Sequence, residues 1–170
     1  YANSEPGYPD ASKWLDEYPN LVVTRSFSKV HGLGGLRVGY ALSHPQVADL
    51  LNRVRQPFNC SSPAQAAAAA SLADNQHIDR SVALNTEQRD VLARGLEELG
   101  LPLLPSVGNF LTFNAGERAG AINEGLLRSG VIVRPVDAYG LPGHIRVTVG
   151  TPAENRTFLT ALAEQLKGAA

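Results

Sequence analysis

Apolar residues along the chain recur alternately at strand-like and helix-like spacings. Short runs rich in β-branched and aromatic residues alternate with longer segments whose apolar positions repeat at the helical period. This pattern predicts strands at residues 21–25, 36–42, 107–113, 131–136 and 145–149. It predicts helices at residues 11–18, 43–54, 62–70, 78–99, 119–128 and 151–166. The interleaving of the two kinds of element indicates an α/β chain.

Polar residues mark where several of these helices begin. Ser43, followed by Gln46 three positions later, has the spacing of a capping box, so we expect Ser43 to cap the second helix. Ser62 gives a similar signal at the start of the alanine-rich helix. Thr151 and Glu154 form a full capping box for the last helix. Gly100 is the expected C-cap of the long helix before it.

Four helices have an expected packing face. Trp14 and Leu15 are the apolar residues of the first, short helix, and we expect them to face inward. The alanine run at residues 66–70 favours a helix that neighbouring backbones approach closely, so we expect it to be buried. The other two stripes, at helical spacing, consist of Val47, Leu50, Leu51 and Val54, and of Phe158, Leu159, Leu162 and Leu166.

The organisation of the chain changes partway along it. We place a boundary near residue 77, inside or just after the alanine-rich helix. Residues 1–77 have an α/β pattern. Residues 78–170 have the order strand, helix, strand, strand, helix, which predicts a small α+β unit with helices on one face of a sheet.

Composition and charge narrow the classes of function. The net charge is −1, so no overall positive field attracts nucleic acid or a membrane surface, and we expect neither as a partner. Apolar runs stay short of the ~20 residues that cross a bilayer. The single cysteine, Cys60, excludes an internal disulfide and favours a reducing, cytoplasmic setting. The four histidines lack metal-ligand spacing, so we expect no metal.

The stretch SFSKVHGLGGLRVGY, residues 26–40, carries the strongest candidate chemistry. Lys29 offers an amine that can form a Schiff base with a carbonyl, and Arg37 offers a planar fork suited to phosphate. Glycines between them allow close backbone approach. Pyridoxal 5′-phosphate combines a carbonyl with a phosphate and would use all these groups. On spacing alone, a solvated glycine-rich turn is an equal alternative. A dinucleotide site is weaker, because Arg37 stands where its third glycine is needed.

The same stretch resembles the lysine motif of the fold-type I pyridoxal-phosphate aminotransferases. The resemblance implies that Lys29 bonds covalently to the cofactor. It implies that Ser26, three residues before, and Arg37, eight residues after, bind the cofactor phosphate. His31 stands where an aromatic residue is more usual. Tyr1 resembles the tyrosine that bonds to the cofactor's ring oxygen, and the aspartate that pairs with the pyridine nitrogen would then precede it.

Within this family the likeness is greatest to the histidinol-phosphate aminotransferases. It rests chiefly on the segments VIVRP, residues 131–135, and IRVTVGT, residues 145–151. An arginine inside an apolar strand needs an anion, which is either a ligand or a local carboxylate. The resemblance implies that Arg146 binds the substrate carboxylate. It places Arg134 near the substrate's other end, where it could meet a phosphate.

The resemblance also implies how the whole enzyme is built. Residues 1–77 would end a large cofactor domain with a mixed, mostly parallel sheet, and residues 78–170 would form a small C-terminal domain. The implied reaction is transamination of histidinol phosphate with 2-oxoglutarate by a homodimer. Because the chain begins at Tyr1 and contains no methionine, we expect a fragment that lacks the N-terminal half and is inactive alone. An aromatic amino acid aminotransferase, a phosphothreonine decarboxylase of the same fold, and a non-catalytic fragment stay open as alternatives.

Overall fold

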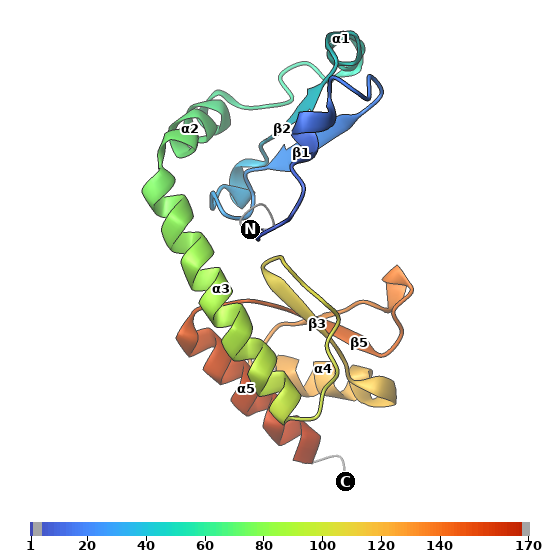
Figure 1. Ribbon diagram of the computed structural model, residues 1–170. Helices are drawn as coiled ribbons and strands as arrows, with labels where there is room; N and C mark the ends of the chain where they lie inside the picture. The colour runs from blue at the N-terminus through green and yellow to red at the C-terminus, as the bar shows by residue number, and fades with distance from the viewer. Residues whose placement is uncertain (2–4, 168–170) are drawn as a thin grey trace. The chain divides into compact units, whose positions relative to one another are not determined.

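The computed structural model describes residue 1 and residues 5–167, which form two compact units. Residues 5–82 form the first unit, and residues 83–167 together with Tyr1 form the second. Figure 1 labels helices and strands of both. The division falls inside helix α3 (Asn75–Glu98), a few residues past the boundary that we expected near residue 77. Among the described residues, no helix is both long enough and apolar enough to span a bilayer.

The first unit is built on one antiparallel strand pair. β1 (Val22–Ser26) pairs residue for residue with β2 (Gly39–Ser43). The strand expected at 21–25 is thus confirmed, and the strand expected at 36–42 is confirmed with a later start. Every strand pair in the described part of the chain is antiparallel. The mostly parallel sheet that we expected is therefore not found among these residues.

Helix α1 (Pro45–Val54) begins at a different cap from the one predicted. The cap is His44, whose Nδ1 accepts a hydrogen bond from the backbone N–H of Gln46 at 3.4 Å, so the prediction of Ser43 was wrong. Pro45 explains the difference, because proline is favoured at the first helical position and makes the preceding residue the cap. The predicted apolar stripe exists but is exposed, by 58%, 46% and 80% at Leu50, Leu51 and Val54.

Helix α2 (Ser62–Ala73) also begins at a neighbouring cap. The hydroxyl of Ser61 accepts a hydrogen bond from the backbone N–H of Ala64 at 3.3 Å, so Ser61 and not Ser62 caps the helix. Ala64 and Ala68, one turn apart, are buried. The expectation of a buried alanine helix therefore holds for this one stripe, while most alanines of the run are exposed.

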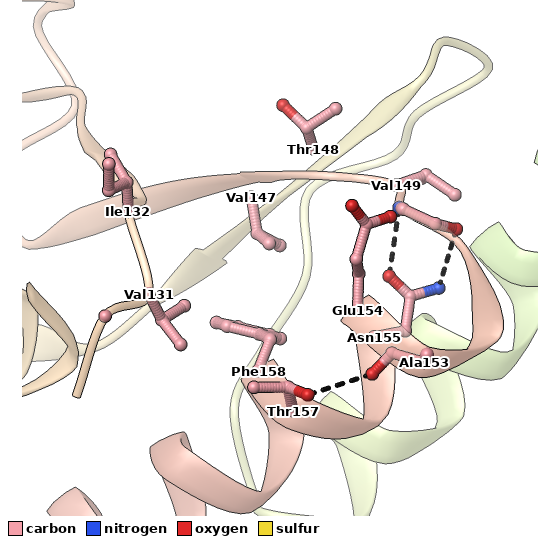
Figure 2. Close-up of a pocket in the computed structure, with 12 residues that line it drawn as sticks. Val131, Ile132, Val147, Thr148, Val149, Ala153, Glu154, Asn155, Thr157 and Phe158 are labelled. Carbon is pink, nitrogen blue, oxygen red and sulfur yellow. Dashed lines mark hydrogen bonds between the residues drawn. The ribbon is translucent and has the colours of Figure 1, made fainter.

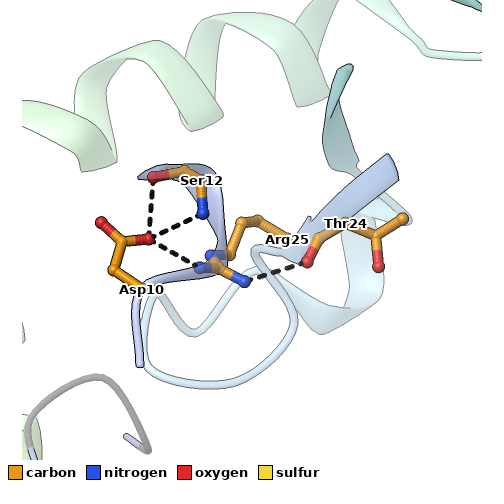
Figure 3. A network of polar contacts seen from close by, with 4 residues as sticks. All are labelled: Asp10, Ser12, Thr24 and Arg25. Carbon is orange, nitrogen blue, oxygen red and sulfur yellow. Dashed lines mark hydrogen bonds and ion pairs between the residues drawn. The ribbon is translucent and has the colours of Figure 1, made fainter. Parts of the chain in front are cut away.

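The helix expected at residues 11–18 is reduced to a single 3₁₀ turn, η2 (Ala11–Trp14). Trp14 is 43% exposed, so the expectation that it faces inward was wrong. The turn is fixed by polar contacts instead: the carboxylate of Asp10 accepts hydrogen bonds from the N–H and the hydroxyl of Ser12, and it pairs with Arg25 of β1 at 3.6 Å (Figure 3). The hydrogen bond from the Ser12 hydroxyl lowers the pKa of Asp10.

The second unit contains a three-stranded antiparallel sheet in the order β3–β5–β4. Its elements after α3 are β3 (Phe110–Asn114), η4 (Gly116–Arg118), α4 (Ala119–Arg128), β4 (Arg134–Pro135), η5 (Asp137–Tyr139), β5 (His144–Thr148) and α5 (Pro152–Lys167). The strand expected at 145–149 and the helix expected at 119–128 are confirmed, and the strand expected at 107–113 is confirmed with a start at Phe110. The strand expected at 131–136 forms only at β4, although its valines still pack against the core.

The core of the second unit lies between one face of the sheet and the three helices α3, α4 and α5. Its fully buried large side chains are Leu92, Leu96, Phe113, Leu126, Ile145 and Leu162. Ile145 and Val147 of β5 face this core, so the residues that alternate with them lie on the opposite face of the sheet. The predicted packing of helices on one face is therefore confirmed.

Both predicted caps of the second unit are confirmed. Glu154 accepts hydrogen bonds from the backbone N–H and hydroxyl of Thr151 at 2.7 and 2.8 Å, and these bonds lower the pKa of its carboxyl. At the end of α3, Gly100 has a φ of +74°. The N–H of Leu101 donates back to the carbonyl of Leu96 at 3.0 Å, which completes a Schellman motif.

Leu126 and Leu127 offer a matched test of this core, because they are neighbours on α4 and are 0% and 57% exposed. We expect Leu126→Ala to lower the free energy of unfolding by about 2–5 kcal/mol, since it leaves a cavity. Leu127→Ala removes the same atoms from an exposed site, and we expect a loss below about 1 kcal/mol. Denaturant unfolding of the two variants measures both values, and equal losses would contradict the described core.

Candidate functional site

Lys29 lies on a loop that the β1–β2 pair closes. Ser26, the last residue of β1, stands opposite Gly39, the first residue of β2. Past this pair, the backbone N–H of Phe27 donates to the carbonyl of Val38 at 3.2 Å, and the Phe27 side chain is only 3% exposed. The base of the loop is therefore fixed by backbone bonds and a buried ring, while Lys29 itself is exposed.

Close backbone contacts explain two glycines of the motif. A Cβ at Gly39 would lie 2.7 Å from the carbonyl oxygen of Arg25, and a Cβ at Gly34 would lie 3.3 Å from that of Ser28. The first contact excludes a side chain unless the strands shift. The second shows that the glycine segment folds back against the residue just before Lys29.

Arg37 is held in an unusual backbone conformation. Its φ is 53°, in the left-handed region, and its Nη1 donates to the carbonyl of Gly34 at 2.8 Å. It follows the 3₁₀ turn η3 (Gly34–Leu36), so its expected place at the start of a strand was wrong. A non-glycine residue with positive φ is uncommon, and such strain is concentrated at binding and active sites. The loop thus directs a guanidinium group back over its own glycines.

The loop is rich in donors and cationic groups. Residues 26–40 include no aspartate or glutamate, and neither Lys29 nor Arg37 forms an ion pair within the described part of the chain. The Ser26 hydroxyl accepts the N–H of Ser28 at 3.0 Å and keeps its own hydrogen to donate. An amine, hydroxyls and a guanidinium on one loop fit a ligand that carries a carbonyl and a phosphate.

His31 takes the place of the aromatic residue expected in this motif. Its ring lies 4.8 Å from that of Phe27, in a tilted arrangement, and its Nδ1 lies 3.3 Å from the hydroxyl of Ser71. Burial, and to a lesser extent the nearby His77, lower the pKa of His31. The imidazole therefore packs as an aromatic ring, which explains why the motif tolerates it.

The second unit holds the other two predicted residues side by side. Arg134 of β4 stands directly opposite Arg146 of β5, whose other neighbour is Thr112 of β3. Because Ile145 and Val147 face the core, both arginines lie on the face of the sheet that the core helices leave open. Like charges directly opposite one another destabilise a strand pair, so this arrangement favours an anion between them.

Aromatic rings hold both guanidinium groups. That of Arg146 lies 5.0 Å from the centre of the Phe110 ring, and that of Arg134 lies 5.5 Å from the centre of the Tyr139 ring. Both distances are within the range of cation–π attraction. Neither arginine forms an ion pair with any described residue. Sequence reasoning missed Phe110 and Tyr139, because their contacts depend on strand register and on a turn.

A pocket of about 570 Å³ lies beside the end of β5 in the second unit, between Ile132, Val147 and Phe158 (Figure 2). Its lining includes no predicted site residue, and its carboxylate, Glu154, already accepts hydrogen bonds from Thr151 in the capping box of α5.

Tyr1, expected to bond to the cofactor ring, is half-buried, and burial raises the pKa of its hydroxyl. Its cofactor role stays a prediction.

The sequence of the chain is similar to those of known aminotransferases. The family model for aminotransferase class I and II matches residues 1–162. The chain is 54% identical over 158 residues to histidinol-phosphate aminotransferase 2 of Pseudomonas fluorescens strain Pf0-1, covering 93% of this chain and 43% of that protein. It is 49% identical over 167 residues to histidinol-phosphate aminotransferase 1 of Nitrosococcus oceani, covering 98% of this chain and 45% of that protein.

A solved aminotransferase structure also matches the fold of the chain. The crystal structure of histidinol-phosphate aminotransferase from Sinorhizobium meliloti in complex with pyridoxal-5′-phosphate matches with a TM-score of 0.88 and 30% identity, over 99% of this chain and 47% of that one. The expected α/β aminotransferase fold is confirmed at this level. The chain spans less than half the length of the relatives that it matches.

The lowered pKa of His31 predicts a pH effect. The unfolded histidine has a pKa of about 6.5, and burial holds the folded pKa below it. The unfolded state therefore binds more protons as the pH falls through that region, and the free energy of unfolding decreases. His31→Phe keeps an aromatic ring and removes the titration, so we expect a shallower decrease. Denaturation at several pH values measures it, and NMR titration of His31 with a midpoint at or above the unfolded pKa would contradict the prediction.

Proposed function

The chain belongs to the family of class I and II aminotransferases, and from that premise we propose that the whole protein is a histidinol-phosphate aminotransferase. It would transfer an amino group from histidinol phosphate to 2-oxoglutarate in histidine biosynthesis. The observation that carries the proposal is the 54% identity to the Pseudomonas fluorescens enzyme over 93% of this chain. The resident cofactor is pyridoxal 5′-phosphate, which the related Sinorhizobium meliloti enzyme binds.

The paired arginines support this choice of substrates. Histidinol phosphate carries a phosphate and no carboxylate, whereas 2-oxoglutarate carries two carboxylates. Guanidinium groups bind both kinds of anion through two parallel hydrogen bonds. We assign Arg146 to the carboxylate of 2-oxoglutarate and Arg134 to the phosphate of histidinol phosphate, which takes the place of a carboxylate beside the α-carbon of that substrate. Their opposition across β4 and β5 places two such forks next to each other.

Lys29, Ser26 and Arg37 would hold the cofactor, and the donor-rich loop that bears them fits it. Ser26 and Arg37 bind its phosphate, and the hydrogen bond from Arg37 to Gly34 fixes the direction of the guanidinium. When bound, the cofactor supplies an electron sink for the carbanion that forms at the substrate α-carbon. Once the substrate's amine has displaced it from the cofactor, the Lys29 amine would take the proton that leaves this carbon, acting as a general base, and Tyr1 would donate to the cofactor ring.

The proposal extends to the organisation of the whole protein. Residues 1–77 would complete a large cofactor domain, and residues 78–170 would form the small domain. The full-length protein would be a cytoplasmic homodimer. The relatives are more than twice as long as their matched portion, so the remaining cofactor contacts would come from outside this chain.

Arg134→Gln in the full-length protein tests the substrate. We expect its KM for histidinol phosphate to rise about tenfold or more, because a charge-assisted bond to phosphate is lost, with little change in KM for 2-oxoglutarate. Arg128→Gln is the control, since Arg128 is exposed and forms an ion pair with Glu124 one turn away.

The unaltered full-length enzyme tests the alternative functions. Preference for phenylalanine over histidinol phosphate would favour an aromatic amino acid aminotransferase. Release of carbon dioxide from phosphothreonine would favour the decarboxylase alternative.

Borohydride reduction of the cofactor-loaded full-length protein tests the lysine. We expect a cofactor adduct on the peptide that contains Lys29, because this lysine is the one that shares a loop with Ser26 and Arg37. The peptides of Lys13 and Lys167 serve as internal controls, and mass spectrometry locates the adduct. An adduct elsewhere, or none, would favour a non-catalytic role. Turnover by the isolated 170-residue chain would contradict its expected inactivity.

A further inference from the structure

The residues just after Lys29 form a tight turn. The N–H of Gly32 donates to the carbonyl of Lys29 at 2.8 Å, and Gly32 has a φ of +70°. Lys29 is therefore the first residue of a four-residue turn in which Val30 and His31 are central. The direction of the Lys29 side chain depends on how firmly this turn is held.

Side chains far along the sequence hold both central residues of the turn. Nε2 of His77 lies 3.0 Å from the carbonyl oxygen of Val30, across 47 residues. The hydroxyl of Ser71 lies 3.3 Å from Nδ1 of His31, across 40 residues. Ser71 is on α2 and His77 is in the first turn of α3, so the turn is attached to the junction of two helices.

The partners decide which atoms carry the hydrogens. A carbonyl oxygen only accepts, so Nε2 of His77 carries a hydrogen and donates it to Val30. The hydroxyl of Ser71 donates its one hydrogen to the carbonyl of Ala68 at 3.0 Å. Its oxygen therefore accepts from Nδ1 of His31. Both contacts are hydrogen bonds with a defined donor, and both join the turn to the helices.

The helix junction is itself braced at His77. The backbone N–H of His77 donates to the carboxylate of Asp74 at 3.0 Å, between the end of α2 and the start of α3. The hydroxyl of Ser81, one turn further on, lies 3.5 Å from the same Nε2. Because that nitrogen's hydrogen already goes to the closer Val30 oxygen, Ser81 adds little to the attachment.

We propose that His77 is a positioning residue for Lys29: its bond to the Val30 carbonyl, assisted by the Ser71–His31 bond, fixes the turn that aims the Lys29 amine. This inference rests on the proposed function, in which Lys29 moves the proton. His77 touches neither substrate nor cofactor in this role. It acts by limiting the backbone conformations available to Lys29, and correct orientation of a proton-transfer group governs rate more than binding.

The decisive variant is His77→Phe in the full-length enzyme, which keeps a ring but removes the donor. We expect kcat for transamination to fall about tenfold, the size of one lost hydrogen bond. We expect KM for both substrates to stay within about twofold, because no substrate contact is removed. His77→Gln places an amide donor at the position of Nε2, and we expect it to restore most of kcat. Ser81→Ala is the matched control, with kcat unchanged.

Hydrogen exchange in the cofactor-free full-length protein gives a second readout. In His77→Phe we expect exchange at the Gly32 amide to rise about tenfold, while amides within α2 keep their rates. Should this variant fail to fold, Ser71→Ala removes the other bond, and we expect a smaller loss of kcat with unchanged KM. Unchanged kcat and Gly32 exchange in the folded variants overturn the proposal. Loosening of the whole unit, without rescue by glutamine, also overturns it.

The two proposals fail in different ways. If the unaltered enzyme does not turn over histidinol phosphate, the proposed substrate is wrong. The hydrogen-exchange rate of the Gly32 amide still tests the role of His77 in that case, because it is measured without cofactor or substrate. If the unaltered enzyme is active and His77→Phe matches it in kcat and in Gly32 exchange, only the positioning role is wrong.

Discussion

Positive charge without a carboxylate partner is the constraint that two groups of candidate residues share, one group in each unit. Lys29 and Arg37 in the first unit, and Arg134 and Arg146 in the second, form no ion pair within the described part of the chain. Elsewhere the same chain pairs its arginines readily, as Arg53 does with Asp49 and Arg128 with Glu124. Other basic residues, among them Arg80 and Arg118, also form no ion pair within the described part of the chain, so the four candidate positions share the lack of a local counter-ion with other sites. This lack leaves the charges free for anions that arrive from solution.

Each guanidinium is nevertheless held in place by neutral groups. A carbonyl oxygen binds Arg37, and aromatic rings lie against the two arginines of the sheet. These contacts orient a cation without neutralising it, which a carboxylate could not do. This arrangement destabilises the fold locally, through a positive φ at Arg37 and through like charges opposite each other in β4 and β5. Local costs of this kind concentrate at functional sites, because the surrounding fold offsets them.

The sequence predicted most elements, but not the contacts that depend on register. Helix 119–128 and the Thr151 capping box follow from local spacing, and both are confirmed. The cap of α1 shifted to His44 because Pro45 is favoured at the first helical position, whereas the cap of α2 moved one residue earlier, to Ser61, and nothing in the structure explains that shift. The apolar stripe of α1 was recognised, but periodicity alone cannot say that these residues leave it exposed. The pairing of Arg134 with Arg146 depends on the register between β4 and β5, and the local sequence around each residue does not reveal that register.

The contacts of His77 show why such a residue is hard to find by reading a motif. It stands 47 residues from its partner and bonds to a backbone carbonyl, so no residue type at the other end signals the contact. The hydrogen bond from His77 also does not depend on the protonation state of the ring. Nε2 of His77 and Nδ1 of His31 are donors when the rings are neutral, and they remain donors when the rings are protonated. The geometry of the turn is thus independent of the charge of either histidine. Protonation of His31 alters the charge near Lys29 and the stability of the unit, but it leaves the turn that carries Lys29 hydrogen-bonded to the helices.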